Sequence, residues 1–191
     1  MSLVIFLGLI AVVLLYFITL YNNLVQLKHN VTKAWSNIDV LLKQRHDELP
    51  KLVETCKQYM QFEQTTLEKV MQARAGVAAA RETHNIGALG TAETSLRSGL
   101  SALFATVEAY PELKANEHFQ HLTARITELE NSIADRREFY NESVNLNNVR
   151  IEQFPDVVIA RFFQFEAAQT LEFAEDDRRD ADLSNLFSSG S

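Results

Sequence analysis

The first 27 residues of this chain carry no charged side chain, and a helical pattern follows them without a break. Residues 3–20 are almost wholly apolar, and as a helix they would be about 27 Å long, close to the thickness of a bilayer's hydrocarbon core. No Pro or Gly separates them from the amphipathic pattern that begins at Leu24. We therefore predict a membrane anchor over residues 1–21 that continues into a long packing helix. Its apolar side chains include Leu3, Leu7, Leu14, Phe17 and Leu20.

A cleaved secretory signal is the alternative interpretation of this segment. Signal peptides have a basic start, a shorter apolar stretch and small residues at the cleavage site. Here the start offers only a terminal amine, and residues 14–18 are bulky, so a retained anchor is favoured. Lys28 and Lys33 follow the span and no basic residue precedes it. The positive-inside rule then predicts a single pass, with the N-terminus outside and the body in the cytoplasm.

The charge and cysteine content restrict the partners of the body. A net charge of -7 argues against nucleic acid, which requires a basic footprint. No cluster of basic residues flanks the anchor, so the sequence does not indicate binding to anionic lipid headgroups. The single cysteine, Cys56, excludes an intramolecular disulfide framework and fits a reducing compartment.

The residues after the anchor predict an all-α fold. Apolar residues recur at spacings of three and four, as in amphipathic helices, and no convincing alternating strand is present. Breaks are expected at residues 84–90, at Tyr110-Pro111 and at Phe154-Pro155, while Pro50 either kinks the first helix or begins a second one. We predict an up-and-down four-helix bundle over residues 22–153, continuous with the N-terminal transmembrane helix. Its expected core includes Leu24, Trp35, Ile38, Leu42, Leu52, Leu129 and Ile133.

Residues 154–173 form a strongly apolar, aromatic segment that we expect to be a closing helix. A helix offers only part of its circumference to one core, and side chains one or two residues apart point in different directions. Part of the segment should therefore contact the bilayer or a neighbouring subunit, and a neighbour is the favoured partner. The residues expected there are Val158, Phe162, Phe163 and Phe165. Residues 174–191 are acidic and end in Ser and Gly, which predicts a disordered tail.

Two blocks of the sequence resemble the LemA family of bacterial membrane proteins. The first block contains Tyr21-Asn22-Leu24-Val25, Ala34-Trp35-Ile38-Asp39, Leu42-Lys43-Arg45, Asp47, Pro50 and Leu52-Val53. The second contains residues 110–116, Glu130-Asn131-Ile133-Ala134, Arg137, Tyr140-Asn141, Val144 and Phe154-Pro155. The resemblance implies an anchored, cytoplasm-facing bundle of long helices without an established enzymatic activity. One branch of the family acts in magnetosome membrane formation, and other members are encoded near a membrane zinc metalloprotease. Gln44 and the acidic tail depart from the family pattern.

Few residues of the chain fit a metal or catalytic site. His118 and His121 are three residues apart and could share a helix face, but a structural zinc site needs four ligands and the chain offers no pattern for the others. A di-iron bundle requires Glu-x-x-His pairs, and none of the five histidines follows a Glu by three residues. Cys56 lies on an apolar stripe and is interpreted as a core residue. We therefore expect no enzyme, metal or cofactor.

A group of charged residues around Arg45 is more informative. Asp39 and Lys43 are four residues apart with the acid first, the favourable order for a helical ion pair. Arg45 shares the spacing of the apolar stripe, so it would point inward and need a carboxylate partner. Three interpretations remain open: a satisfied network within the bundle, a solvated charged face, and a charged register device between subunits.

Two functions follow as hypotheses. The first is a non-enzymatic, membrane-anchored helical scaffold that forms a large homo-oligomer and organises or shapes the inner membrane. The second is an adaptor that binds a membrane protease or another envelope protein. Both require the lipid bilayer as a partner, and the two are distinguished by what co-purifies with the chain.

Overall fold

The computed structural model describes residues 1–173, and everything within them that is regular is helical. The helices are α1 (Ser2–Lys57), α2 (Gln64–Glu82), α3 (Ile86–Val107), α4 (Pro111–Lys114), α5 (Glu117–Glu152) and α6 (Asp156–Phe162). The predicted all-α fold, with its N-terminal apolar helix, is confirmed. The tail expected over residues 174–191 lies outside the described residues.

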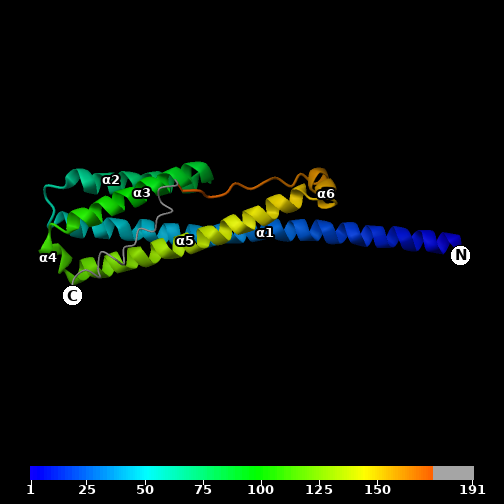
Figure 1. The fold of residues 1–191 in the computed structure, drawn as a ribbon, viewed down its shortest axis with the longest axis horizontal. Helices are drawn as coiled ribbons and strands as arrows, with labels where there is room; N and C mark the ends of the chain where they lie inside the picture. The colour runs from blue at the N-terminus through cyan, green and yellow to red at the C-terminus, as the bar shows by residue number, and fades with distance from the viewer. Residues whose placement is uncertain (174–191) are drawn as a thin grey trace. The chain divides into compact units, whose positions relative to one another are not determined.

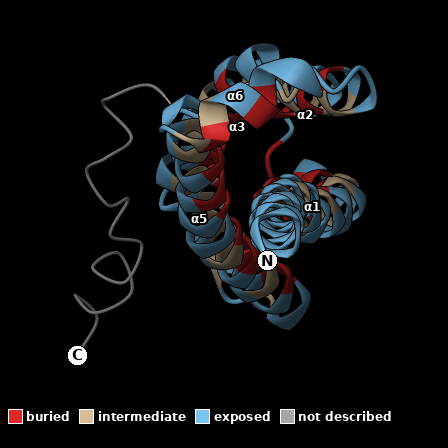
Figure 2. Ribbon diagram, turned by 90° about the vertical axis from the view of Figure 1, so that its right-hand side faces the viewer, coloured by how far each residue is buried: buried red, intermediate tan, exposed pale blue. Residues whose placement is uncertain are grey.

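The chain divides into two compact units. Unit 1 comprises Met1–Asn37 and Glu138–Thr170, and unit 2 comprises Ile38–Arg137 with the described residues from Leu171 onward. The helices of both units are amphipathic, so buried residues follow one side of each long helix past the membrane segment (Figure 2).

Unit 2 contains the four-helix arrangement. The last part of α1, then α2, α3 and the first part of α5 alternate in direction through short connections, and α2 and α3 lie side by side (Figure 1). Asn85 caps α3, because its side-chain oxygen accepts a hydrogen bond from the backbone N–H of Ala88 at 2.9 Å. This cap starts the helix at Ile86, so the loop predicted over residues 84–90 is shorter than expected.

Pro50 lies inside α1, so the alternative in which it begins a second helix is wrong. Pro has no N–H, which leaves the carbonyl oxygen of His46 without its partner in the helix. Arg74 of α2 replaces that partner, since its Nε donates to this oxygen at 2.8 Å and its Nη2 lies 2.6 Å from Nε2 of the His46 ring. A side chain from the neighbouring helix thus satisfies the group that the proline leaves free.

Unit 1 is built from the first part of α1, the last part of α5, α6 and an extended segment, residues 165–170, that follows α6. The extended segment is fixed to α5, because Asn148 exchanges two hydrogen bonds of 2.9 Å with the backbone of Ala168 and the hydroxyl of Tyr140 donates to the carbonyl of Gln169 at 2.8 Å. The closing helix predicted over residues 154–173 is therefore wrong in extent: α6 ends at Phe162, and Gln164 has a positive φ of 56°. Side chains of α5, rather than helical bonds, satisfy the backbone beyond it.

Candidate functional site

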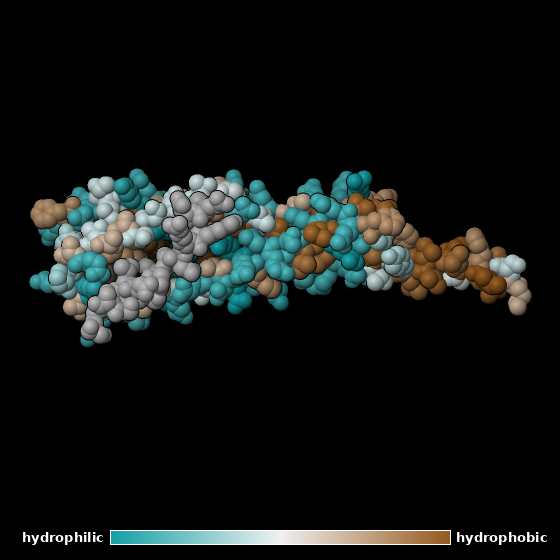
Figure 3. Space-filling model, in the orientation of Figure 1, coloured by the Kyte–Doolittle hydropathy of each residue, from teal (hydrophilic) through white to brown (hydrophobic). Residues whose placement is uncertain are grey.

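The apolar beginning of α1 is the first functional feature of the chain. By length and composition, α1 alone among the described residues qualifies as a membrane-spanning helix, with a mean hydropathy of 3.0 over its most apolar window. Hydrophobic residues cover this part of the molecule (Figure 3). Of the predicted anchor residues, Leu3, Leu7, Leu14 and Phe17 are exposed. Leu20 is buried, so it belongs to the core of unit 1 rather than to the lipid-facing surface.

Helix α6 packs against the end of this apolar segment. Ile159 and Ala160 are buried in one cluster with Leu20 and Leu24 of α1 and Ile151 of α5. At the first residue of α6, the buried carboxylate of Asp156 pairs with Nε of Arg150 at 2.9 Å. These contacts fix both the position and the rotation of α6 within unit 1.

Aromatic rings extend the same contact. The ring of Phe163 lies 4.7 Å from the ring of Tyr21, and the ring of Phe162 lies 5.0 Å from that of Phe163. Phe165 also contacts Tyr21, with 6.0 Å between ring centroids, and packs on the cluster of unit 1. Because Tyr21 directly follows Leu20, the structure brings the aromatic segment to the end of the apolar span.

The four predicted contact residues of this segment differ in exposure. Val158 is 53% exposed, Phe162 is 80% exposed and Phe163 is 52% exposed, whereas Phe165 is half-buried. Val158 and Phe162 are four residues apart, on the side of α6 opposite Ile159 and Ala160. Three of the four therefore present apolar surface that nothing in unit 1 covers, while Phe165 is mainly a packing residue.

Arg45 is the centre of a buried ionic network in unit 2. Its side chain is 1% exposed and points inward, as the stripe spacing predicted. Its Nη2 pairs with Oε1 of the fully buried Glu93 on α3, and its Nη1 donates to Oε1 of Glu130 on α5 at 2.6 Å. Glu130 in turn pairs with Nε of Arg97 at 3.3 Å. One arginine thus ties three helices of the bundle together.

Burial and charge set the protonation of this network. Burial alone would lower the pKa of Arg45, but the carboxylates of Glu93 and Glu130 raise it above its usual value, so the guanidinium stays charged. Burial raises the pKa of Glu93, and the charge of Arg45 opposes that rise. Nε of Arg45 and Oε2 of Glu93 are buried without a hydrogen-bond partner among the described residues. The network is therefore well paired but incompletely satisfied.

The sequence prediction did not include Glu93 and Glu130 as partners of Arg45, although the spacing of residues along α3 and α5 identifies both carboxylates. Glu93 lies in phase with Leu89, Leu96 and Leu100 on α3, and Glu130 lies in phase with Ile126 and Ile133 on α5. A carboxylate within an apolar stripe must be paired or neutral. One such residue on each of two helices, with an inward arginine on a third, would have predicted the network.

The C-terminal end of the described chain covers this region of unit 2. The ring of Phe173 lies 4.1 Å from the guanidinium carbon of Arg137 and 5.3 Å from that of Arg97, so it is stacked on two cations. The backbone of Glu172 lies so close to Gly90 of α3 that a Cβ on this residue would collide with the Glu172 carbonyl oxygen. Gly90 therefore allows the backbone of Glu172 to pack directly against α3, because glycine has no side chain.

Most of the predicted core is buried, with one correction. Leu24, Ile38, Leu42, Leu52, Leu129 and Ile133 are each exposed by 2% or less. Trp35 is only half-buried and meets the ring of Tyr140 edge-on at 5.8 Å. Ala34 takes the buried position beside it, because the apolar stripe of α1 drifts by one residue there. Trp35 is thus a flank of the core rather than its anchor.

The other sequence candidates do not assemble into a site. His118 and His121 are exposed, and within residues 1–173 no group of three or more His, Cys, Asp or Glu could hold a metal ion. Cys56 is buried, and burial raises the pKa of its thiol to about 12, so it stays protonated at neutral pH. Asp39 pairs with Arg81 of α2 at 3.4 Å. That cross-helix pair takes the place of the expected pair with Lys43.

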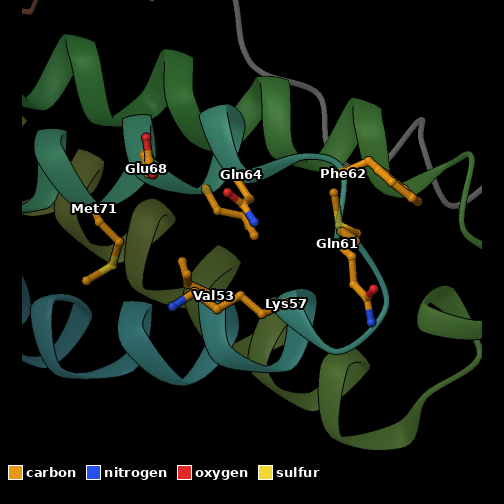
Figure 4. A pocket seen from close by; sticks show the side chains of 9 residues that line it. Val53, Lys57, Gln61, Phe62, Gln64, Glu68 and Met71 are labelled. Atoms are coloured by element: carbon orange, nitrogen blue, oxygen red, sulfur yellow. The ribbon is translucent and has the colours of Figure 1, made fainter.

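A pocket of about 640 Å³ opens in unit 2 where α1 connects to α2 (Figure 4). Met60, Leu67 and Met71 give it an apolar lining, and Lys57 and Glu68 supply charge at its border. Phe62 stands on the connecting loop and is 95% exposed. The pocket has the size of a small-molecule or peptide site.

Comparisons with known proteins agree with the sequence resemblance. The chain matches the LemA family over residues 34–184. It is 24% identical over 172 residues to magnetosome protein MamQ 2 of Paramagnetospirillum magneticum, covering 78% of this chain and 63% of the relative. It is 25% identical over 169 residues to protein LemA of Metamycoplasma hominis, covering 86% of this chain and 74% of that protein.

The chain thus spans a little under two thirds of the length of the magnetosome relative. Residues from the two blocks that carry the resemblance meet in the fold: Arg45 binds Glu130, and Trp35 contacts Tyr140. Together with the apolar N-terminal helix, these matches indicate a membrane-associated protein. The chain belongs to the LemA family.

Proposed function

We propose that this chain is a non-enzymatic, membrane-anchored helical scaffold that self-associates and so organises or shapes the bacterial inner membrane. In this proposal the N-terminus is periplasmic and the body is cytoplasmic, because the first basic residues, Lys28 and Lys33, follow the span. The names of the magnetosome relatives agree with a role at a membrane.

The observation that carries the proposal is an exposed apolar face on α5 in unit 1, the unit that also contains the anchor. Phe139, Leu146 and Val149 are 53%, 51% and 44% exposed. Their spacing of seven and three residues places them on one side of the helix. Leu146 and Val149 also border a groove of about 480 Å³ that includes Leu27 of α1. We call Phe139, Leu146 and Val149 the α5 face.

A second copy of the chain is the proposed partner of the α5 face. Exposed apolar surface is disfavoured in water by about 25 cal/mol per Å². Copies anchored in one membrane share an orientation and a plane, which raises their effective concentration. Head-to-tail contacts between identical subunits anchored in one plane either close into a ring or propagate as a lattice.

Purification of the full chain in mild detergent tests the proposal. A scaffold should yield a large, homogeneous particle that contains one protein. Replacing Leu146→Ser together with Val149→Ser should reduce the particle size, while Phe62→Ser, a matched loss of exposed apolar surface in unit 2, should leave it unchanged. A monomeric wild-type chain, or a double variant of wild-type size, would contradict the proposal.

The adaptor function is the second candidate, and the pocket at the α1–α2 connection favours it. Its apolar lining and the exposed Phe62 suit a peptide segment of a protein partner. In the same purification, an adaptor should yield a small oligomer with a second protein band. Phe62→Ser should remove that band if the pocket binds the partner.

A further inference from the structure

The exposed side of α6 points away from the core of unit 1. Helix α6 packs on α1 at a defined position, beside Leu20 and Leu24. We call Val158, Phe162 and Phe163 the α6 face. The sequence alone left two partners for these residues, the bilayer and a neighbouring subunit. The contacts of α6 within unit 1 distinguish between them.

The height of the α6 face follows from its contacts with α1. Residues 3–20 span about 27 Å, so a bilayer that accommodates them has its hydrocarbon boundary close to Tyr21. Phe163 lies against the ring of Tyr21, and the buried side of α6 packs on Leu20 and Leu24. In such a bilayer, α6 would lie where the hydrocarbon meets the headgroups.

The composition of α6 suits that position. Apolar and aromatic side chains cover its exposed side, and Arg161 is exposed at its last turn. Helices that lie in a membrane interface combine a bulky apolar side with flanking basic residues whose charged ends reach the headgroups. Tyr21 is itself a residue type enriched at membrane boundaries.

From this arrangement we infer that the α6 face inserts into the acyl–headgroup boundary of the same bilayer leaflet that α1 leaves, and so forms a second contact of the chain with lipid. The inference rests on the membrane anchor of the proposed function but not on its self-association. Its partner is a phospholipid surface, and uncharged headgroups suffice because apolar side chains provide the contact. The insertion would fix the rotation of unit 1 about the membrane normal.

Tryptophan fluorescence tests the insertion. Trp35 is the only tryptophan of the chain, so Trp35→Phe gives a silent background. In that background, Phe162→Trp reports on the α6 face and Phe62→Trp, on the loop of unit 2, is the matched control. Each full-length variant is reconstituted into phosphatidylcholine vesicles that carry bromine on their acyl chains, and flotation confirms that it is membrane-bound.

The expected result is quenched, blue-shifted emission for Phe162→Trp, with bromine near the headgroup quenching more than bromine near the chain end. The Phe62→Trp control should show water-exposed emission without quenching. If a floating Phe162→Trp variant is not quenched, the inference is wrong. Phe162→Ser with Phe163→Ser then identifies the occupant: a smaller particle in detergent assigns the face to a second copy, and an unchanged particle assigns it to neither.

The two proposals fail separately. A chain that is monomeric in detergent but quenched at the α6 face removes self-association and leaves the lipid contact intact. A chain that does not float with the vesicles at all removes both proposals, because the anchor itself is then missing.

Discussion

Replacing Arg45 with Met should destabilise the bundle strongly. The substitution keeps the length and much of the apolar volume of the side chain but removes the guanidinium. Glu93 is fully buried and has Arg45 as its ionic partner, whereas Glu130 retains Arg97. The variant therefore leaves one buried carboxylate without its ion-pair partner.

The magnitude follows from the cost of an unpaired buried charge. Breaking a buried pair by removing one partner costs about 3–5 kcal/mol, while replacing both partners by apolar residues of similar size is often neutral or stabilising. Arg45→Met should fall in that range. Adding Glu93→Met should restore most of the loss, because Nε of Arg45 and Oε2 of Glu93 are unsatisfied already and their removal carries no further penalty.

Thermal unfolding of the full chain in mild detergent, followed by circular dichroism, measures these effects. In Arg45→Met the main charge that opposes the burial of Glu93 is lost, so the pKa of this carboxyl rises further, and only the charge of Arg97 still lowers it. When a carboxyl has a higher pKa in the folded than in the unfolded state, the folded state loses stability as the pH rises from the unfolded pKa through the folded pKa. The variant should therefore be least stable at alkaline pH and regain stability towards acid pH. Additive losses in the double variant, or a pH-independent loss in Arg45→Met, would refute the assignment of Glu93 as the uncompensated charge.

Three further outcomes are expected from the structure. Gly90→Ala should destabilise the chain by about 1–3 kcal/mol, because the added Cβ meets the backbone of Glu172. Gly99→Ala should stabilise it slightly, because a Cβ there has ordinary contact distances of 3.5 Å and more and alanine favours the helix. The melting temperatures of both variants, compared with that of the wild type, test these effects. Burial and Arg74 lower the pKa of His46 below 6.5, so part of the stability present above that pH should be lost as the pH falls through the lowered pKa, and His46→Gln should flatten this dependence in a pH series of melts. A C-terminal reporter that is active only in the cytoplasm should be active, and digestion of the body by protease in intact spheroplasts would overturn the topology.

The sequence predicted those parts of the fold that depend on periodicity and on single residues. The stripe spacing placed Arg45 inside the bundle, and the need of a buried cation for a carboxylate was met by Glu93 and Glu130. The excess of apolar residues after Pro155 predicted an uncovered face, which the structure shows at Val158 and Phe162. In each case one side chain and its neighbours on the same helix contained the information.

The parts that the sequence did not predict depend on contacts between elements far apart along the chain. Pro50 does not end α1, because Arg74 supplies the missing donor from another helix. The segment after Phe163 is extended, because Asn148 and Tyr140 bind its backbone. Trp35 is half-buried because Ala34 takes the core position. No local sequence pattern indicates these distant partners. Helix propensity alone therefore predicted a longer closing helix and a fully buried Trp35.

Cysteine cross-linking in native membranes tests self-association through the α5 face most directly. Cys56 is the only cysteine, so Cys56→Ala provides a background without thiols. In it, Val149→Cys places a thiol on the α5 face, and Ser101→Cys places one at an exposed position of α3 in unit 2. After the thiol is labelled with a benzophenone maleimide, irradiation should join the Val149→Cys chain covalently to a second copy and leave the Ser101→Cys chain monomeric. Absence of the dimer at Val149→Cys, or equal yields at both positions, would contradict the account.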